Sequence, residues 1–260
     1  MRRQIAIGLL ALLLVGCSAP PSERPDFIIA AAADLRFAMD DIAKRFQLLH
    51  PEVTVKVIYG SSGQFYQQIE NTAPYDVYCS ADLEYPRKLA QNGLAMPGTE
   101  FQYAVGRIVI WVSKKSTKFP GEVNLQSLRD PSVKFISISN PGHAPYGKAA
   151  VAAMTSLGVY GSVKDKLVFA ENVSQAWQYI DTGAADIGII ALSLALAQTV
   201  KDAGRYWELP LDSYPRMDQG GVILKSTKNE ATARAFRSFI LADTGRSVLK
   251  NYGFFMPNEK

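Results

Sequence analysis

The chain has 260 residues, 48% of them hydrophobic, which is enough for one or two hydrophobic cores. Its 28 Lys and Arg against 24 Asp and Glu give a net charge of +4, without a basic cluster suited to nucleic acid. Two histidines and two cysteines make no zinc-binding pattern, so the composition argues against a nucleic-acid-binding or structural-zinc protein.

The N-terminus has the pattern of an exported lipoprotein. A basic start precedes an apolar run over residues 5–15, which is shorter than the roughly 20 residues that a membrane-spanning helix needs. Residues 14–17 match the bacterial lipobox, in which cleavage leaves a cysteine as the new N-terminus and its sulfur takes a diacylglyceryl group. We therefore predict a signal peptide over 1–16 and lipidation at Cys17. The alternative is an ordinary signal peptide in which the cysteine stands by chance.

The predicted lipid anchor has two further consequences. Residues 17–26 are rich in proline and predict an unfolded tether between the membrane and the folded domain, which would be held in the periplasm or at the cell surface. Acylation of Cys17 would leave Cys79 as the only free cysteine, so we expect no intramolecular disulfide and a buried, unreactive thiol.

Beyond the tether, short β-rich runs alternate with helical periods, which predicts an α/β fold with parallel βαβ architecture. Glycines that favour a left-handed helix end follow several of the helices. Strands are predicted over residues 27–30, 53–57, 76–79, 108–112, 135–138, 168–170, 187–191 and 221–224. Helices are predicted over 35–49, 64–70, 86–92, 146–157, 174–182, 193–203, 229–241 and 245–252, with stops at Gly93, Gly158, Gly183 and Gly204.

Two such series without a Gly- or Ser-rich linker predict two lobes that share strands, with a ligand cleft between them. We expect one lobe to comprise residues 27–107 plus 216–260, and the other to comprise 108–215. The expected protein is a monomer.

Five strand-to-helix junctions are the candidate binding positions, because such junctions gather at the carboxyl edge of a parallel sheet. Each offers unpaired main-chain N–H groups at a helix start, which favour an anion, and none carries Lys or Arg. For any single junction the alternative is plain helix capping. The junctions are residues 33–34, 60–63, 80–82, 140–147 and 172–174.

Several of these strings, in this order, resemble the periplasmic molybdate-binding proteins. The resemblance extends from Asp26 to Pro257. It implies a two-lobed type II periplasmic binding protein fold, no cofactor, and molybdate or tungstate as the ligand. It also implies the membrane permease of an ABC importer with its ATPase as partner. The matching segments are residues 31–35, 60–63, 73–82, 138–141, 144–147, 171–173 and 251–254.

The resemblance also implies which residues bind the oxyanion, with molybdenum held only through its oxygens. Ser62 matches a serine that donates through its hydroxyl and main chain. Tyr146 falls where one branch of the family has a tyrosine and others use a main-chain N–H of alanine. Val173 matches a main-chain donor. The complete predicted set is Ala33, Asp34, Ser61, Ser62, Tyr146 and Val173.

Two positions depart from the family pattern. Ser or Asn is common where this chain has Asp34, and a carboxylate facing an anion would repel it. We expect the carboxylate to cap the following helix. The alternatives are a protonated acid that faces the ligand, or an acceptor for the proton of a phosphate. Ala191 stands where some members have a tyrosine that reaches the ligand.

Three other functions compete with this interpretation. Sulfate and phosphate also present tetrahedral oxygens to neutral donors. A ferric-ion carrier would use phenolates, for which the candidates are Tyr59, Tyr66, Tyr75, Tyr78 and Tyr146. A serine hydrolase would use Ser61 or Ser62 with a histidine base such as His143, which lies in a loop expected to face the cleft. Residues 60–63 lack the Gly-x-Ser-x-Gly spacing, and the chain has no adjacent tyrosine pair, so we expect a binding protein and not an enzyme.

Overall fold

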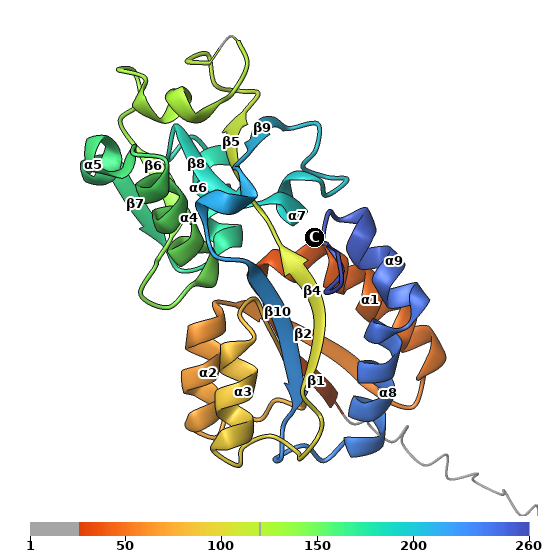
Figure 1. The fold of residues 1–260 in the computed structure, drawn as a ribbon. Coiled ribbons are helices and arrows are strands. Elements are labelled where there is room, and N and C mark those ends of the chain that lie inside the picture. Colours follow the sequence, from red (N-terminus) through yellow and green to blue (C-terminus); the bar gives the residue numbers. More distant parts are fainter. Residues whose placement is uncertain (1–25, 120, 260) are drawn as a thin grey trace, which may run out of the picture.

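The computed structural model describes residues 26–119 and 121–259, so the predicted signal peptide, Cys17 and all of the tether but its last residue lie outside the described residues. Within these two ranges no helix combines the length and hydrophobicity needed to span a bilayer. The described chain forms two lobes, each built on a five-stranded sheet, one below the other in Figure 1.

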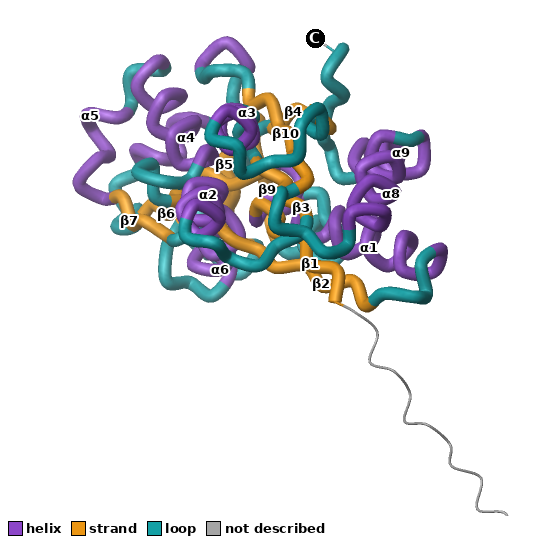
Figure 2. Tube along the Cα trace, turned by 90° about the horizontal axis from the view of Figure 1, so that it is seen from below, coloured by secondary structure: helices purple, strands orange, loops and turns teal. Residues whose placement is uncertain are grey.

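The first lobe combines the N-terminal part of the chain with its C-terminal end. Its strands are β1 (Asp26–Ala32), β2 (Thr54–Gly60), β3 (Val77–Ser80), β4 (Phe101–Gly106) and β10 (Met217–Ile223). Its helices are α1 (Arg36–Leu49), α2 (Ser62–Glu70), α3 (Glu84–Gln91), α8 (Glu230–Leu241) and α9 (Asp243–Asn251). The strand order is β2-β1-β3-β10-β4, and β10 runs antiparallel to both of its neighbours. Figure 2 shows α1, α8 and α9 on one side of the strands and α2 and α3 on the other.

The second lobe lies between the two parts of the first in the sequence. Its strands are β5 (Ile108–Ser113), β6 (Ile136–Ser139), β7 (Leu167–Ala170), β8 (Ile187–Ala191) and β9 (Gly204–Glu208). Its helices are α4 (Pro145–Ser156), α5 (Tyr160–Val163), α6 (Val173–Asp181) and α7 (Leu192–Ala195). The strand order is β7-β6-β8-β5-β9, in which β5 is antiparallel to both neighbours.

The core of the first lobe shows why these segments fold together. Phe27 on β1 is fully buried, and its ring lies 6.1 Å from that of Phe46 on α1 and 5.8 Å from that of Phe236 on α8. Burying each large aromatic side chain contributes roughly 1.5–3 kcal/mol. One central strand is thereby fixed against helices from both ends of the chain. Cys79 on β3 is also buried as expected, and this burial raises the pKa of its thiol.

The chain crosses between the sheets twice, and the crossings are adjacent. Arg107 joins β4 to β5, and residues 209–216 join β9 to β10. Met217 pairs with Gly106 in the ladder between β10 and β4. Movement of one lobe against the other would therefore be concentrated in these two neighbouring segments.

All eight predicted strands are present, but β4 and β9 were missed, and the parallel βαβ pairs are joined by β5 and β10, which run antiparallel to their neighbours. The predicted helix over residues 193–203 is also wrong, because α7 ends at Ala195 and Gly204 begins β9. A Cβ atom at Gly204 would lie 2.1 Å from the ring of Trp111, so this glycine permits close strand packing instead of ending a helix. The other three predicted glycine stops are confirmed, with φ of 70° at Gly93, 68° at Gly158 and 81° at Gly183.

Candidate ligand-binding site

A small cavity lies between the lobes, where β1, β2 and β3 end and where α2, α4 and α6 begin. The structure brings together in its wall all six residues of the predicted oxyanion site, and each of them is buried. These six are Ala33, Asp34, Ser61, Ser62, Tyr146 and Val173. All five predicted junctions, which are far apart in the sequence, contribute residues to this wall, so the predicted residues can act on a common ligand here.

Two helix starts direct main-chain donors at the cavity. The first N–H groups of a helix have no partner within it, and the helix dipole makes them attractive to an anion. Ser62 is the first residue of α2 and Val173 is the first residue of α6. The Asn172 side chain caps α6 by accepting the Gln175 N–H at 3.0 Å, which leaves the Val173 N–H free of that cap.

Ser62 is positioned as a hydroxyl donor. Its Oγ accepts the main-chain N–H of Ala81 at 3.0 Å, and its carbonyl accepts the Tyr78 hydroxyl at 2.7 Å. Both bonds are buried, so β3 and the residue that follows it fix the serine from within the first lobe. Since Oγ is engaged only as an acceptor, its own proton remains to be donated to a group in the cavity.

Ser61, Gly63 and His143 join the lobes at the rim of the cavity. Ser61 Oγ donates to the His143 carbonyl at 2.7 Å, and the Gly63 N–H donates to the same oxygen at 3.0 Å. His143 Nδ1 lies 2.9 Å from Ser61 Oγ. Beside them Gln64 of α2 donates to Glu171 of the second lobe. We call Ser61, Gly63 and His143 the rim contact; it uses the Ser61 hydroxyl that the sequence assigned to the ligand.

The rim contact brings a serine and a histidine together, but in the wrong arrangement for a hydrolase. A nucleophilic serine gives its proton to the imidazole. The proton of Ser61 is directed at a carbonyl, so Nδ1 of His143 is the donor in their contact. His143 Nε2 lies 3.9 Å from Glu171, too far for the hydrogen bond of a catalytic triad.

Asp34 lies in a one-turn 3-10 helix, Ala33–Leu35, between β1 and α1, and the expected capping role is wrong. Neither this turn nor α1 has a side-chain cap. Asp34 Oδ2 instead accepts the Tyr146 hydroxyl at 2.9 Å and Gln219 Nε2 at 2.7 Å. Its Oδ1 is buried without a hydrogen-bond partner among the described residues. The side chain therefore faces the interior of the cleft and not the start of α1.

Burial also changes the charge that Asp34 carries. Loss of solvent raises its pKa to about 6, against the opposing effect of the hydrogen bonds from Gln219 and Tyr146. The nearby main-chain N–H groups of Asp34 and Leu35 also lower this pKa, but neither is close and aligned enough to form a hydrogen bond with Oδ1. The carboxyl is thus neutral over a wider pH range than an exposed one.

Sequence reasoning missed Gln219 on β10. This residue is fully buried, donates to both Asp34 and the Tyr146 hydroxyl, and accepts the Tyr103 hydroxyl at 3.1 Å. Gly106 makes room for the group, because a Cβ there would lie 2.5 Å from Tyr146 Oη and 2.6 Å from Gln219 Nε2. The sequence could have indicated this role, because Gln219 is a polar residue inside a largely apolar strand. A polar side chain is unfavourable at a buried position unless it forms hydrogen bonds.

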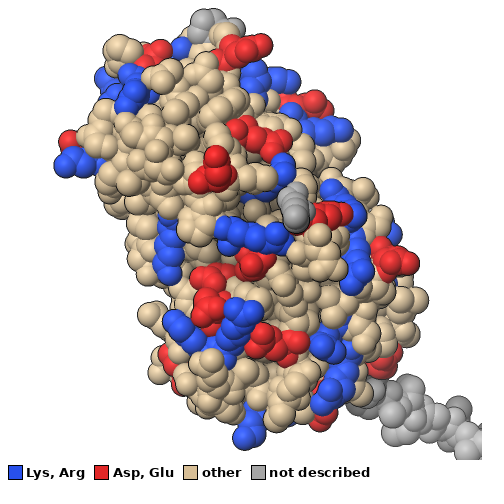
Figure 3. Space-filling view, in the orientation of Figure 1, with Lys and Arg blue, Asp and Glu red and all other residues tan. Residues whose placement is uncertain are grey.

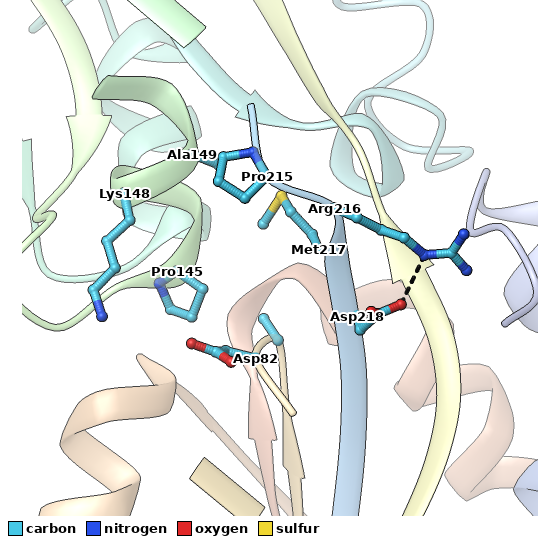
Figure 4. Close-up of a pocket in the computed structure, with 9 residues that line it drawn as sticks. Asp82, Pro145, Lys148, Ala149, Pro215, Arg216, Met217 and Asp218 are labelled. Carbon is cyan, nitrogen blue, oxygen red and sulfur yellow. Dashed lines mark hydrogen bonds and ion pairs between the residues drawn. The ribbon is translucent and has the colours of Figure 1, made fainter. Parts of the chain in front are cut away.

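A second, larger cavity adjoins the first and shares Ala81 and Pro145 with it. Its wall carries charges of both signs, and Figure 4 shows the ion pair between Arg216 and Asp218, whose atoms are 2.9 Å apart. On the face shown in Figure 3, basic and acidic side chains are likewise interspersed. This outer cavity differs from the inner one, whose wall contains no Lys or Arg.

The five candidate phenols for ferric iron do not share a site, since each hydroxyl donates to a different partner. No group of three or more His, Cys, Asp or Glu that could hold a metal ion occurs in the part of the chain that the structure describes. The partners are Asp40 for Tyr59, Glu70 for Tyr66, Gln68 for Tyr75, the Ser62 carbonyl for Tyr78, and Asp34 for Tyr146.

Two lobes that enclose a buried cavity without basic side chains define a solute-binding protein. The family described as bacterial extracellular solute-binding protein matches residues 27–255, and the chain belongs to this family. It is 35% identical over 251 residues to the molybdate-binding protein ModA of Rhodobacter capsulatus, covering 95% of each chain. It is also 30% identical over 250 residues to the putative ABC transporter substrate-binding lipoprotein YvgL of Bacillus subtilis, covering 94% of this chain and 93% of that one.

A solved structure agrees with these relatives. The periplasmic molybdate-binding protein of Azotobacter vinelandii superposes with a TM-score of 0.82 at 34% identity, covering 89% of this chain and 100% of that one. The predicted resemblance to the molybdate-binding proteins and the predicted two-lobed fold are therefore confirmed. So is the expectation of a binding protein instead of an enzyme.

Proposed function

We propose that this protein captures molybdate between its lobes and delivers it to the permease and ATPase of an ABC importer. The observation that carries the proposal is the convergence of the Ser62 hydroxyl with the starts of α2 and α6 in one buried cavity. Neutral donors can hold a dianion without a salt bridge, which suits a carrier that must also release it. Similarity to molybdate-binding proteins over nearly the whole chain supports this ligand.

The donors recognise the shape and charge of the oxyanion and make no contact with its central atom. Tungstate has nearly the same size as molybdate, so we propose that both bind. No cofactor takes part in this scheme. The protein acts as a monomer in which residues 27–107 with 216–260 close against residues 108–215.

Calorimetric titration of the soluble domain tests the ligand assignment. Molybdate and tungstate are expected to bind with one ligand per protein, and sulfate and chromate much more weakly. A preference for phosphate would favour the second candidate, a phosphate carrier, for which the unpartnered oxygen of Asp34 could accept the proton of the ligand. Absence of binding to molybdate and tungstate would contradict the proposed function.

We also propose that Cys17 is lipidated and anchors the exported protein to a membrane. The lipobox and the proline-rich tether support this, as does the similarity to a relative described as a lipoprotein. Replacing Cys17 with serine should give an uncleaved or soluble protein without the lipid mass. A Cys17→Ser variant that enters the detergent phase and keeps the lipid mass would place the anchor elsewhere.

A further inference from the structure

The two oxygens of Asp34 have different surroundings, and the difference locates a proton. Oδ2 already accepts two hydrogen bonds, from Tyr146 and Gln219. Oδ1 accepts none, although it is fully buried at the cavity. An unpaired, buried carboxylate oxygen is strongly disfavoured, whereas a protonated one becomes a donor that can point at a ligand.

The neighbouring groups cannot neutralise a negative charge on Asp34. The titratable groups that face it are the phenols of Tyr146 on α4 and Tyr103 on β4, and burial raises the pKa of both, so both stay neutral. From the second lobe the nearest polar contacts come from hydroxyls, since Ser193 Oγ donates to the Asp34 carbonyl at 2.7 Å. No basic side chain is among its hydrogen-bond partners in the described residues.

An oxyanion in this cavity would lie beside the Asp34 side chain, whose Oδ1 has no partner, because Ser62, Val173 and Asp34 line the same small space. Two negative groups a few ångströms apart in a site without solvent repel strongly. The repulsion disappears when Asp34 takes up a proton, and the same proton then adds one hydrogen bond to the ligand.

We propose that Asp34 carries a proton on Oδ1 when the site is occupied and that this O–H donates a hydrogen bond to the bound oxyanion. Each dianion is thus captured together with one proton, which stays on Asp34. This inference rests on the proposed function. At a pH where Asp34 is ionised in the free protein, its carboxylate takes up one proton from solution when the ligand binds. The ligand enters as the dianion, and no covalent bond other than the O–H is formed. Gln219 and Tyr146 act as positioning residues that occupy Oδ2 and leave Oδ1 to the proton.

The test is calorimetric titration with molybdate from pH 5.5 to pH 8.5, in two buffers that differ in ionisation enthalpy. Above the pKa of the free protein, the affinity of the parent protein should fall about tenfold for each pH unit. The binding enthalpies measured in the two buffers should differ by an amount that corresponds to uptake of close to one proton per molybdate at pH 8. This measurement of proton uptake needs no variant.

Variants assign the proton to its site. In Asp34→Asn an amide donor replaces the acid, so affinity should be flat with pH and roughly one hundredfold above that of the parent at pH 8, about two units above the pKa. Asp212→Asn, which changes an exposed carboxylate, should retain the parent slope.

The outcomes separate the two proposals. Molybdate binding in the parent that is independent of pH, without proton uptake, would overturn the role of Asp34 and leave the proposed function standing. A slope that persists in Asp34→Asn would also overturn it. Failure of the parent to bind molybdate or tungstate at any pH would overturn the proposed function itself.

Discussion

The lobes of this protein are joined at the rim of the cavity and again in its interior, and the two contacts are built differently. At the rim, Ser61 and Gly63 donate to the same carbonyl of His143, and His143 Nδ1 donates to Ser61 Oγ. In the interior, Asp34 accepts from Tyr146 and leaves one buried oxygen unpaired. A satisfied contact holds the lobes together, whereas an unsatisfied one can discriminate among ligands. The rim contact therefore stabilises the closed arrangement of the lobes, and the interior contact determines which ligand can bind between them.

The largest expected effect sharpens the description of the interior. Asp34 has an ordinary pKa of 3.8 that burial raises to about 6, so ionisation opposes folding. The contribution of neutral Asp34 to the free energy of unfolding is fully present below pH 3.8 and is lost as pH rises through about 6. For a shift of about two pKa units, this contribution is about 3 kcal/mol. Relative to the parent, Asp34→Asn should thus gain about 3 kcal/mol in free energy of unfolding between pH 3 and pH 8 without ligand. Urea unfolding at several pH values measures it, and a constant difference would contradict the raised pKa.

The next effect separates the two neighbouring serines. Ser62→Ala removes the hydroxyl donor at the cavity and should weaken molybdate binding by about 1.5–3 kcal/mol, with little change in folding. Ser61→Ala removes a rim hydrogen bond and should weaken molybdate binding by about 0.5–1.5 kcal/mol. Titration of both variants at one pH tests the order. A larger effect for Ser61 would mean that its hydroxyl, and not that of Ser62, reaches the ligand.

The last variant tests the main-chain side of the rim contact, where a Cβ at Gly63 would also lie 2.9 Å from the Tyr85 hydroxyl of the same lobe. A Cβ at Gly63 would lie 2.5 Å from the His143 carbonyl oxygen, so Gly63→Ala should prevent full closure. We expect affinity to fall about tenfold, roughly 1.4 kcal/mol, through faster release of the ligand. Stopped-flow displacement measures that rate. Gly161→Ala is the matched control, since nothing lies within 4 Å of a Cβ there, and equal rates for the two variants would contradict the role of the rim.

The sequence alone predicted the parts of this structure that depend on local pattern. Buried strands such as β1 and the helix ends at Gly93 and Gly158 follow from apolar periodicity and from the need for positive φ. The same reasoning was wrong for residues 193–203, whose apolar spacing suits a helix. Gly204 was interpreted as the end of that helix, but a glycine is required there because the ring of Trp111 packs against it from another strand.

The site was predictable as a set of residues but not as a set of bonds. Asp34 and Tyr146 are 112 residues apart, and Gln219 is 185 residues from Asp34, so no local rule shows that they pair. The predicted cap at Asp34 was reasonable from its place before α1, but it was displaced by these distant donors. Ser61 was likewise assigned from a local string, although its hydroxyl partner comes from the other lobe.

Anomalous diffraction at the molybdenum edge, from crystals grown with molybdate near pH 6, would locate the bound oxyanion. We expect one strong peak in the inner cavity, with molybdate oxygens in hydrogen-bonding distance of Ser62 Oγ, the Val173 N–H and Asp34 Oδ1. A peak in the outer cavity, whose wall includes Lys148 and Arg216, would contradict the proposed site, and so would an inner peak with Asp34 turned away from the oxyanion.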